Sequence, residues 1–226
     1  MTLAETRPAD APPDPATRPI IAVDGPAAAG KGTLARRLAT ELGVPYLDTG
    51  LLYRAVGRRV LDSGADPADP AAAEAVARAL TAEDLVRPGL RAPDTDGAAS
   101  RVAAMPAVRA LLLDFQRNFG RDHGAVLDGR DIGTVVFPAA PVKLYVTASA
   151  EARAHRRWLE RQSRGESVAL EAVAAEMAAR DARDAGRDAA PMKPAEDAVL
   201  LDTTTLDAEA AFAAAMAVVR AKLNLG

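Results

Sequence analysis

The residues best suited to chemistry form a glycine-rich loop, Gly25-Pro-Ala-Ala-Ala-Gly30-Lys31-Gly32-Thr33, between an apolar run and a helical pattern. In such a loop, backbone N–H groups and the N-terminus of the next helix surround phosphate oxygens, and the lysine neutralises the outer phosphates. The loop departs from the strict G-K-[ST] ending, because Gly32 follows Lys31. The hydroxyl that commonly binds Mg²⁺ is absent there, so we expect water and phosphates to hold the ion, with no direct protein ligand.

A second polar cluster, Asp48-Thr49-Gly50-Leu-Leu-Tyr53-Arg54, also follows an apolar run. A small hydroxyl, a glycine and an arginine one helical turn later could place a phosphate at a second helix N-terminus. A strand-to-helix turn capped by Asp48 explains the same residues equally well.

A third cluster, Asp128-Gly129-Arg130-Asp131, follows the apolar residues 125–127. Acids at the carboxyl ends of parallel strands lie at the ligand crevice of α/β sheets. Asp128 could therefore hold the water shell of Mg²⁺, and Arg130 could bind a phosphate. The alternative is a charged turn with an internal ion pair.

Arginines are concentrated in residues 153–164 and 180–187, in a chain with 24 Arg and 4 Lys. The forked guanidinium suits bidentate phosphate contacts. The alternative is ion pairing on solvated helix faces. The acids available for such pairs are Glu151, Glu160, Asp181 and Asp184.

The elements that must position these clusters alternate along the chain. Apolar runs predict strands over residues 20–23, 44–47, 125–127, 142–147 and 199–201. Periodicity and capping predict helices over residues 31–42, 51–61, 71–80, 102–119, 150–164 and 168–183, and from the Asp207 cap to about residue 223. This alternation predicts an α/β fold with a parallel sheet covered on both faces.

Composition narrows the class of protein. The chain has 226 residues and a net charge of −3, which suits one domain and disfavours a nucleic-acid-binding role. With no Cys and two His, Cys-based metal sites and disulfides are excluded, and we expect packing or surface roles for His123, His155 and Trp158. Residues 1–19 are proline-rich and are expected to be a disordered tail before a domain over residues 20–226. The longest apolar run is far shorter than the ~20 residues of a membrane helix, so we expect a cytoplasmic protein without a membrane partner.

From residue 20 almost to its end, the chain resembles the bacterial cytidylate kinase family of P-loop nucleoside monophosphate kinases. The matching runs include YLDTGLLYRAV, ASRVAAMPAVR and LDGRDIGTVVFPAAPVKLYVTAS, and the segment GRDIGTVVFP is far more specific than the P-loop. The resemblance implies a five-stranded sheet of order 2-3-1-4-5 and ATP-dependent phosphorylation of CMP and dCMP. It also implies Mg²⁺ bound with ATP, a monomer, and no nucleic-acid partner.

The resemblance also implies roles for individual residues. The ATP phosphates would be bound by Gly25, Pro26, Ala27, Ala28, Ala29, Gly30, Lys31, Gly32 and Thr33, with Arg156 and Arg157. CMP would contact Asp48 and Tyr53, with Thr49, Arg54 and Arg130 at its phosphate, Ser100, Arg109 and Asp131 at cytosine, and Arg180 and Asp184 at the sugar. Arg153, Arg156, Arg157 and Arg187 would meet phosphates during transfer. The catalytic residues would be Lys31, Asp128, Arg130 and Arg187.

Two segments are expected to move or to differ from the family. Residues 153–187 are expected to form a mobile helical lid. Residues 66–109 correspond to a nucleotide-binding insert that often contains a small antiparallel sheet, but here residues 81–93 are too short for paired strands. We therefore predict one helix near residues 71–80, at most one minimal hairpin at Pro88-Gly89, and one helix presenting Ser100 and Arg109.

Three alternatives differ in what they require of the sequence. A P-loop kinase for UMP, AMP or a shikimate-like acceptor would share the loop but not the GRDIGTVVFP and ASRVAAMPAVR runs. A GTPase would need an N-K-x-D motif, and neither Asn118 nor Asn224 is followed by Lys. A non-catalytic nucleotide-binding module would not need Lys31, Asp128 and the arginines together.

Overall fold

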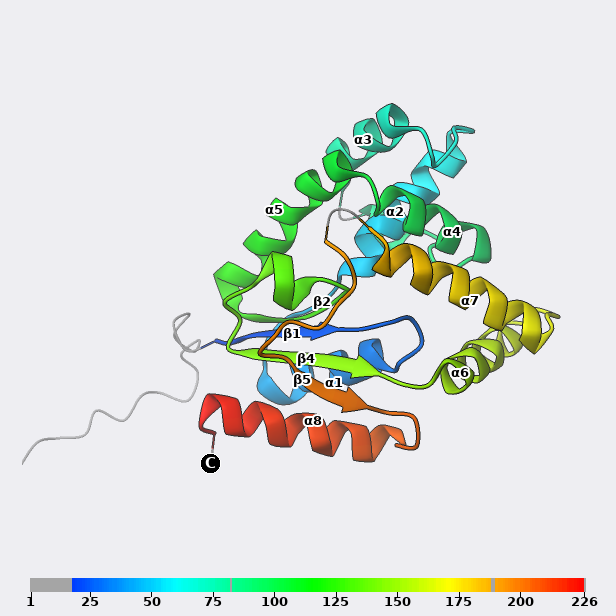
Figure 1. The fold of residues 1–226 in the computed structure, drawn as a ribbon. Helices are drawn as coiled ribbons and strands as arrows, with labels where there is room; N and C mark the ends of the chain where they lie inside the picture. Colours follow the sequence, from blue (N-terminus) through cyan, green and yellow to red (C-terminus); the bar gives the residue numbers. More distant parts are fainter. Residues whose placement is uncertain (1–17, 82, 188–189, 226) are drawn as a thin grey trace, which may run out of the picture.

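The computed structural model describes residues 18–81, 83–187 and 190–225, so most of the predicted tail over residues 1–19 lies outside the described part (Figure 1). Its strands are β1 (Ile20–Asp24), β2 (Tyr46–Asp48), β3 (Ala125–Asp128), β4 (Val142–Thr147) and β5 (Val199–Asp202). They form one parallel sheet of order β2-β3-β1-β4-β5. This confirms the predicted fold class and strand order.

The register brings three acidic residues to the carboxyl edge of the sheet. Asp48 at the end of β2 is opposite Asp128 at the end of β3. Asp128 is in turn paired with Val23, the residue before Asp24. Because the carboxyl ends of adjacent parallel strands meet at one edge, all three carboxylates lie where the loops of this fold hold ligands.

Helices α1 (Lys31–Leu42) and α8 (Ala208–Leu223) cover one face of the sheet. Leu34 and Leu38 lie on one stripe of α1 and pack with the buried strand residues and with Val219 of α8. Gly43, with φ of 63°, ends α1 in the left-handed conformation, and the Val44 N–H bonds back to Ala39. Val44 therefore closes the helix, and the second strand begins at Tyr46, two residues later than predicted.

The opposite face is covered by α5 (Pro106–His123) and by a single π-helical turn, η3 (Ile132–Val136). Ile132 and Val136 pack against the buried strand residues Ala22 and Leu127. The carboxylate of Asp24 accepts hydrogen bonds from the backbone N–H groups of Ile132, at 2.8 Å, and Gly133, at 2.7 Å. Asp24 thus fixes the path of the chain directly after Asp131.

The segment between β2 and β3 contains α2 (Thr49–Asp62), α3 (Pro70–Arg78), the 3₁₀ turn η2 (Glu83–Val86), α4 (Pro93–Val102) and α5. Its described residues include no strand, and no hairpin forms at Pro88-Gly89. The single helix predicted over residues 102–119 was wrong, because two helices meet there. Met105, with ψ of 118°, is extended before Pro106, as a residue before proline tends to be. Ser100 and Arg109 therefore lie on different helices.

Helices α6 (Ala150–Ser163) and α7 (Leu170–Ala185) form a hairpin that projects from the carboxyl edge of the sheet, with α7 returning toward α4 (Figure 1). Ala154, Val173 and Met177 form its small core. Trp158 packs against this core and donates a hydrogen bond from Nε1 to the Val168 carbonyl at 2.9 Å, which confirms its packing role. His155 is exposed beside Trp158, whereas the side chain of His123 lies outside the described part.

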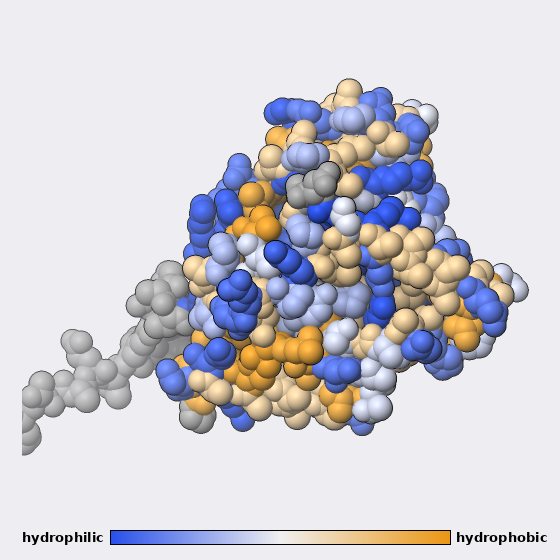
Figure 2. All heavy atoms as spheres, viewed as in Figure 1, coloured by the Kyte–Doolittle hydropathy of each residue, from blue (hydrophilic) through white to orange (hydrophobic). Residues whose placement is uncertain are grey.

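Apolar side chains on the face shown in Figure 2 gather over the edge formed by β4, β5 and α8. Leu200 of the edge strand β5 is 64% exposed there. None of the described helices is both long and apolar enough to cross a membrane.

Candidate active site

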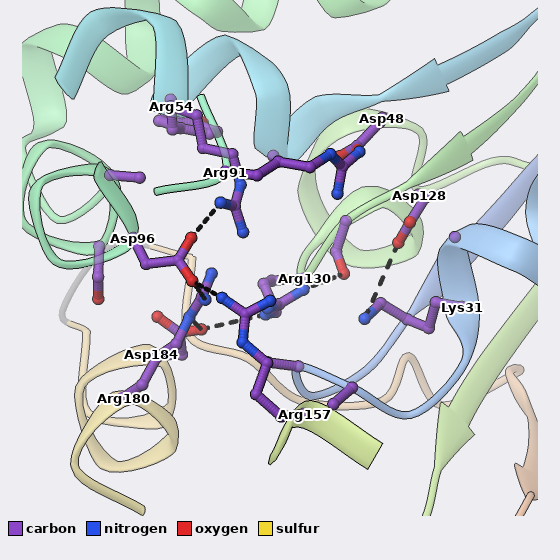
Figure 3. Close-up of a pocket in the computed structure, with 18 of the residues that line it drawn as sticks. Lys31, Asp48, Arg54, Arg91, Asp96, Asp128, Arg130, Arg157, Arg180 and Asp184 are labelled. Atoms are coloured by element: carbon purple, nitrogen blue, oxygen red, sulfur yellow. Dashed lines mark hydrogen bonds and ion pairs between the residues drawn. The ribbon is translucent and has the colours of Figure 1, made fainter. Parts of the chain in front are cut away.

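A cleft of about 1020 Å³ lies at the carboxyl edge of the sheet, between the loop after β1, helices α2 and α4, and the α6–α7 hairpin. It has two ends. The glycine-rich loop and Asp128 form the first end (Figure 3), and arginines and acids from α2, α4, α5, α6 and α7 form the second.

The glycine-rich loop depends on backbone conformations that favour glycine. Gly25 has φ of 137°, and a Cβ at this position would overlap the carbonyl oxygen of Val146. Gly30, with φ of 87°, opens α1 in the left-handed region. The loop residues that line the cleft are Ala27, Ala28, Gly30, Lys31, Gly32 and Thr33, while Gly25, Pro26 and Ala29 form the base of the loop.

Lys31 is buried at the foot of the loop. Its Nζ donates a hydrogen bond to the Pro26 carbonyl at 2.8 Å and lies 3.9 Å from Oδ1 of Asp128. Burial, with a further contribution from the charge of Arg130, lowers the pKa of Lys31 to about 8. In the protein alone, burial disfavours the charged form of Lys31, and a bound phosphate group would stabilise that charge.

Gly32 leaves the space that a P-loop hydroxyl side chain would otherwise enter. A Cβ on Gly32 would lie 3.2 Å from Oδ2 of Asp128 and 3.5 Å from the hydroxyl of Tyr46. The Tyr46 hydroxyl is buried and has no hydrogen-bonding partner among the described residues. A carboxylate and a free phenol therefore face the position of the missing hydroxyl. Tyr46 was missed in the sequence, where it was one residue of an apolar run.

The second end of the cleft contains a buried ion pair between Arg109 and Asp131. Burial raises the pKa of Asp131, and the charge of Arg109 opposes that shift. The Arg109 guanidinium also lies 5.7 Å from the ring centroid of Tyr53. Ser100 accepts a hydrogen bond of 3.3 Å from Arg183, which belongs to the arginine-rich stretch 180–187 but was given no individual role.

Asp184, on α7, holds together three arginines that line the cleft. It pairs with Arg130 at 3.0 Å, with Arg187, and more distantly with Arg180 at 3.8 Å. Although burial raises the pKa of Asp184, the charges of Arg130, Arg187 and Arg180 together hold it below its usual value. These pairs connect the end of β3 to α7.

Asp96, in the first turn of α4, pairs with Arg54 of α2 and with Arg157 of α6, and lies 3.9 Å from Arg180 of α7 (Figure 3). Sequence reasoning missed it. Its neighbours, Pro93-Asp-Thr-Asp96-Gly, are typical of a helix start and carry no motif for a ligand.

The structure brings the predicted site residues into one cleft, apart from the loop base and Arg153. The predicted residues outside the glycine-rich loop that line the cleft are Asp48, Thr49, Tyr53, Arg54, Ser100, Arg109, Asp128, Arg130, Asp131, Arg156, Arg157, Arg180, Asp184 and Arg187. Thr49 donates a hydrogen bond to the Asp128 carbonyl at 2.7 Å, tying α2 to β3. Arg156 is held by Thr203, at 3.1 Å between Nη1 and Oγ1. Arg153 does not line the cleft, because it pairs with Asp181 at 2.6 Å between α6 and α7.

A parallel sheet of this order, a P-loop and a facing arginine-lined end define a P-loop kinase of the nucleoside monophosphate class. A sequence model described as cytidylate kinase matches residues 21–221, and the chain belongs to the cytidylate kinase family. This confirms the resemblance seen in the sequence.

Relatives named cytidylate kinase cover nearly the whole chain. The relative from Granulibacter bethesdensis is 66% identical over 205 residues, which are 91% of this chain and 98% of the relative. The relative from Acidiphilium cryptum is 62% identical over 211 residues, which are 93% of this chain and 100% of the relative. A solved structure of an uncharacterized protein from Eubacterium ventriosum has a TM-score of 0.51 at 13% identity, covering 92% of this chain and 100% of that one, and supports the fold alone.

Proposed function

We propose that this protein transfers the γ-phosphoryl group of ATP to CMP and dCMP, forming CDP and dCDP by in-line transfer. One observation carries the proposal: a single cleft joins a P-loop at one end to a buried Arg109–Asp131 pair and an arginine cluster at the other. Family membership supports the same conclusion.

At the donor end, the loop and α1 would bind the phosphates through backbone N–H groups and Lys31. The Lys31 ammonium would exchange the Pro26 carbonyl for phosphate oxygens, gaining a charged partner in place of a neutral one. Arg130 and Arg187, held by Asp184, would neutralise the charge of the phosphoryl group during transfer.

The donor set around Gly32 fits a hydrated Mg²⁺ ion. Mg²⁺ keeps several waters, and Asp128 with the Tyr46 hydroxyl would accept and orient such waters. The described residues contain no group of three or more carboxylate, His or Cys side chains placed to bind a metal directly. Bound with ATP, the ion would supply charge neutralisation to the phosphates.

The acceptor phosphate supplies the attacking oxygen, so phosphoryl transfer requires positioning and charge rather than a protein nucleophile. Asp131 would accept a hydrogen bond from the 4-amino group of cytosine, and Arg109 would hold Asp131 ionised and in place. Uracil presents an oxygen at that position, so the buried Asp131 carboxylate would face another acceptor and lose this hydrogen bond to the base. Closure of the α6–α7 hairpin would exclude water, and we propose that the protein acts as a cytoplasmic monomer.

A coupled assay of ATP consumption, with the product identified chromatographically, tests the proposal. With Mg²⁺, we expect CMP and dCMP to give CDP and dCDP at rates far above ATP consumption without acceptor. ATP consumption that does not depend on either acceptor would contradict the proposed function.

A further inference from the structure

We infer that Asp96 is an internal anion that occupies the place of the acceptor phosphate among three arginines, and that it sets the anion selectivity of this end of the cleft. The inference rests on the proposed function, because it takes Arg54 as a ligand of the acceptor phosphate. It concerns a residue that the reaction itself does not require.

The geometry places one carboxylate at the meeting point of four helices. One oxygen of Asp96, on α4, pairs with Arg54 of α2, and the other pairs with Arg157 of α6 and lies 3.9 Å from Arg180 of α7 (Figure 3). The side chain of Asp96 is 16% exposed and that of Arg54 is 12% exposed, so water screens these pairs only weakly. Two of the three arginines belong to the hairpin that we expect to move.

The charge balance favours an anion at this point. Burial and the neighbouring Arg130 lower the pKa of Arg180 to about 10, and the charge of Asp96 opposes that shift. Burial also lowers the pKa of Arg54, again opposed by Asp96. Other acids compensate part of this charge, since Glu160 pairs with Arg157 at 2.8 Å and Asp184, which pairs more closely with Arg130, lies 3.8 Å from Arg180. Without Asp96, Arg54 would have no ion pair with the described residues, and Arg157 and Arg180 would keep only Glu160 and the more distant Asp184.

A phosphate monoester has the chemistry to displace this carboxylate. It carries a charge of about −1.5 to −2 at pH 7 and three acceptor oxygens. A carboxylate carries one charge on two oxygens. Arginines that already fit a carboxylate therefore exchange it for a dianion but not for a neutral nucleoside. The exchange also frees Arg157 and Arg180 to contact the incoming phosphates.

This arrangement has two opposing consequences. Apparent affinity for the acceptor phosphate is lowered, since binding must compete with an internal ligand. In return, weak anions are excluded, and arrival of the acceptor is linked to release of α6 and α7 from α4. The inferred role of Asp96 is therefore to position the arginines and to determine specificity.

Calorimetric titration of the full chain with inorganic phosphate, and separately with cytidine, tests the inference. In Asp96→Asn we expect the dissociation constant for phosphate to fall about tenfold, as removal of a charged competitor predicts, with cytidine binding unchanged. Asp94→Asn is the matched control, because Asp94 lies in the same turn but pairs with the surface residue Arg58 outside the cleft. It should match the wild type. Phosphate binding at the P-loop is common to all three proteins and does not affect the comparison.

Thermal unfolding provides a second readout that a merely structural role would not give. Asp96→Asn should unfold at a lower temperature than the wild type without phosphate, and phosphate should restore more of its stability than it adds to the wild type. If the variant does not fold in plain buffer, preparation in phosphate followed by stepwise dilution gives the same comparison. A loss of stability that phosphate does not restore would overturn the inference.

Two further outcomes would contradict it. Unchanged or weaker phosphate binding in Asp96→Asn would mean that Asp96 does not compete with anions, and loss of cytidine binding would make it a direct nucleoside ligand. These outcomes are distinguishable from failure of the proposed function, which is decided by CMP-dependent ATP consumption in the wild-type protein.

Discussion

The two ends of the cleft are built by different means. At the donor end, backbone conformation does the positioning: Gly25 and Gly30 adopt positive φ angles, and the loop passes directly from β1 into α1. At the acceptor end, side chains from α2, α4, α5, α6 and α7 are held by ion pairs, such as Arg109–Asp131 and Arg54–Asp96. The donor end is therefore fixed before any ligand arrives, whereas the acceptor end is held by pairs that a ligand can exchange.

The largest expected effect comes from Lys31, the charged side chain of the glycine-rich loop. Lys31→Met should lower kcat by a factor of about 10² to 10³, because the ammonium stabilises charge that develops during transfer. Methionine keeps the buried stem and removes the charge. Steady-state kinetics with ATP and CMP measure the effect, and circular dichroism confirms the fold. Near-normal turnover would mean that the P-loop lysine is not needed for transfer.

A smaller and more selective effect is expected at the acceptor end. Asp131→Asn should lower kcat/KM for CMP by about tenfold to a hundredfold, since a charged hydrogen bond to the base is lost and Arg109 loses its partner. The kcat/KM for UMP should fall less, so the ratio of kcat/KM for CMP to that for UMP should decrease. An unchanged ratio would contradict the assignment of Asp131 to cytosine.

If backbone conformation builds the donor end, alanine substitutions at two glycines should lower the free energy of unfolding by different amounts. Gly25→Ala should lower the free energy of unfolding by about 2 kcal/mol or more, because it combines a positive φ with overlap on the Val146 carbonyl. Gly64→Ala is the control, since Gly64 has φ of 76° and no atom lies within 4 Å of the position that a Cβ would take. Chemical denaturation should show a smaller loss, of about 1 kcal/mol, for Gly64→Ala. Equal losses would mean that the close approach to β4 is unimportant.

A further effect is a pH dependence that reports on the donor end without ligand. The pKa of Lys31 is lowered by burial from 10.5 to about 8, so unfolding between these pH values takes up a proton. The free energy of unfolding of the wild type should therefore rise with pH from about 8 to 10.5, relative to Lys31→Met. Below pH 8 the buried charge disfavours the folded state, and Lys31→Met should be the more stable protein. If the difference in the free energy of unfolding between the wild type and Lys31→Met did not change from pH 8 to 10.5, burial of the Lys31 charge would not destabilise the folded state.

The same contrast explains what could be predicted from sequence. Residues 31–42 and 142–147 were predicted to the residue, because apolar periodicity, a glycine cap and a β-branched run are local signals. The P-loop is equally local. The break between α4 and α5 was missed although Pro106 marks it, since the apolar pattern continues on both sides.

Side chains whose role depends on distant elements could not be predicted. Asp24 lies just after the strand predicted over residues 20–23 and was given no role, yet its carboxylate holds the N–H groups of Ile132 and Gly133, more than a hundred residues away. Asp96 acquires its role only where α2, α6 and α7 converge. Neither spacing nor residue type reveals such convergence within one sequence.

The specificity constant of the wild-type protein for four acceptors, measured with saturating ATP and Mg²⁺, tests most directly whether the acceptor end selects cytosine. We predict that kcat/KM for CMP and dCMP exceeds that for UMP by about tenfold or more, and that AMP is poorer still, because the Arg109–Asp131 pair is matched to the amino group of cytosine. Equal values for CMP and UMP, or a preference for AMP, would contradict this selectivity.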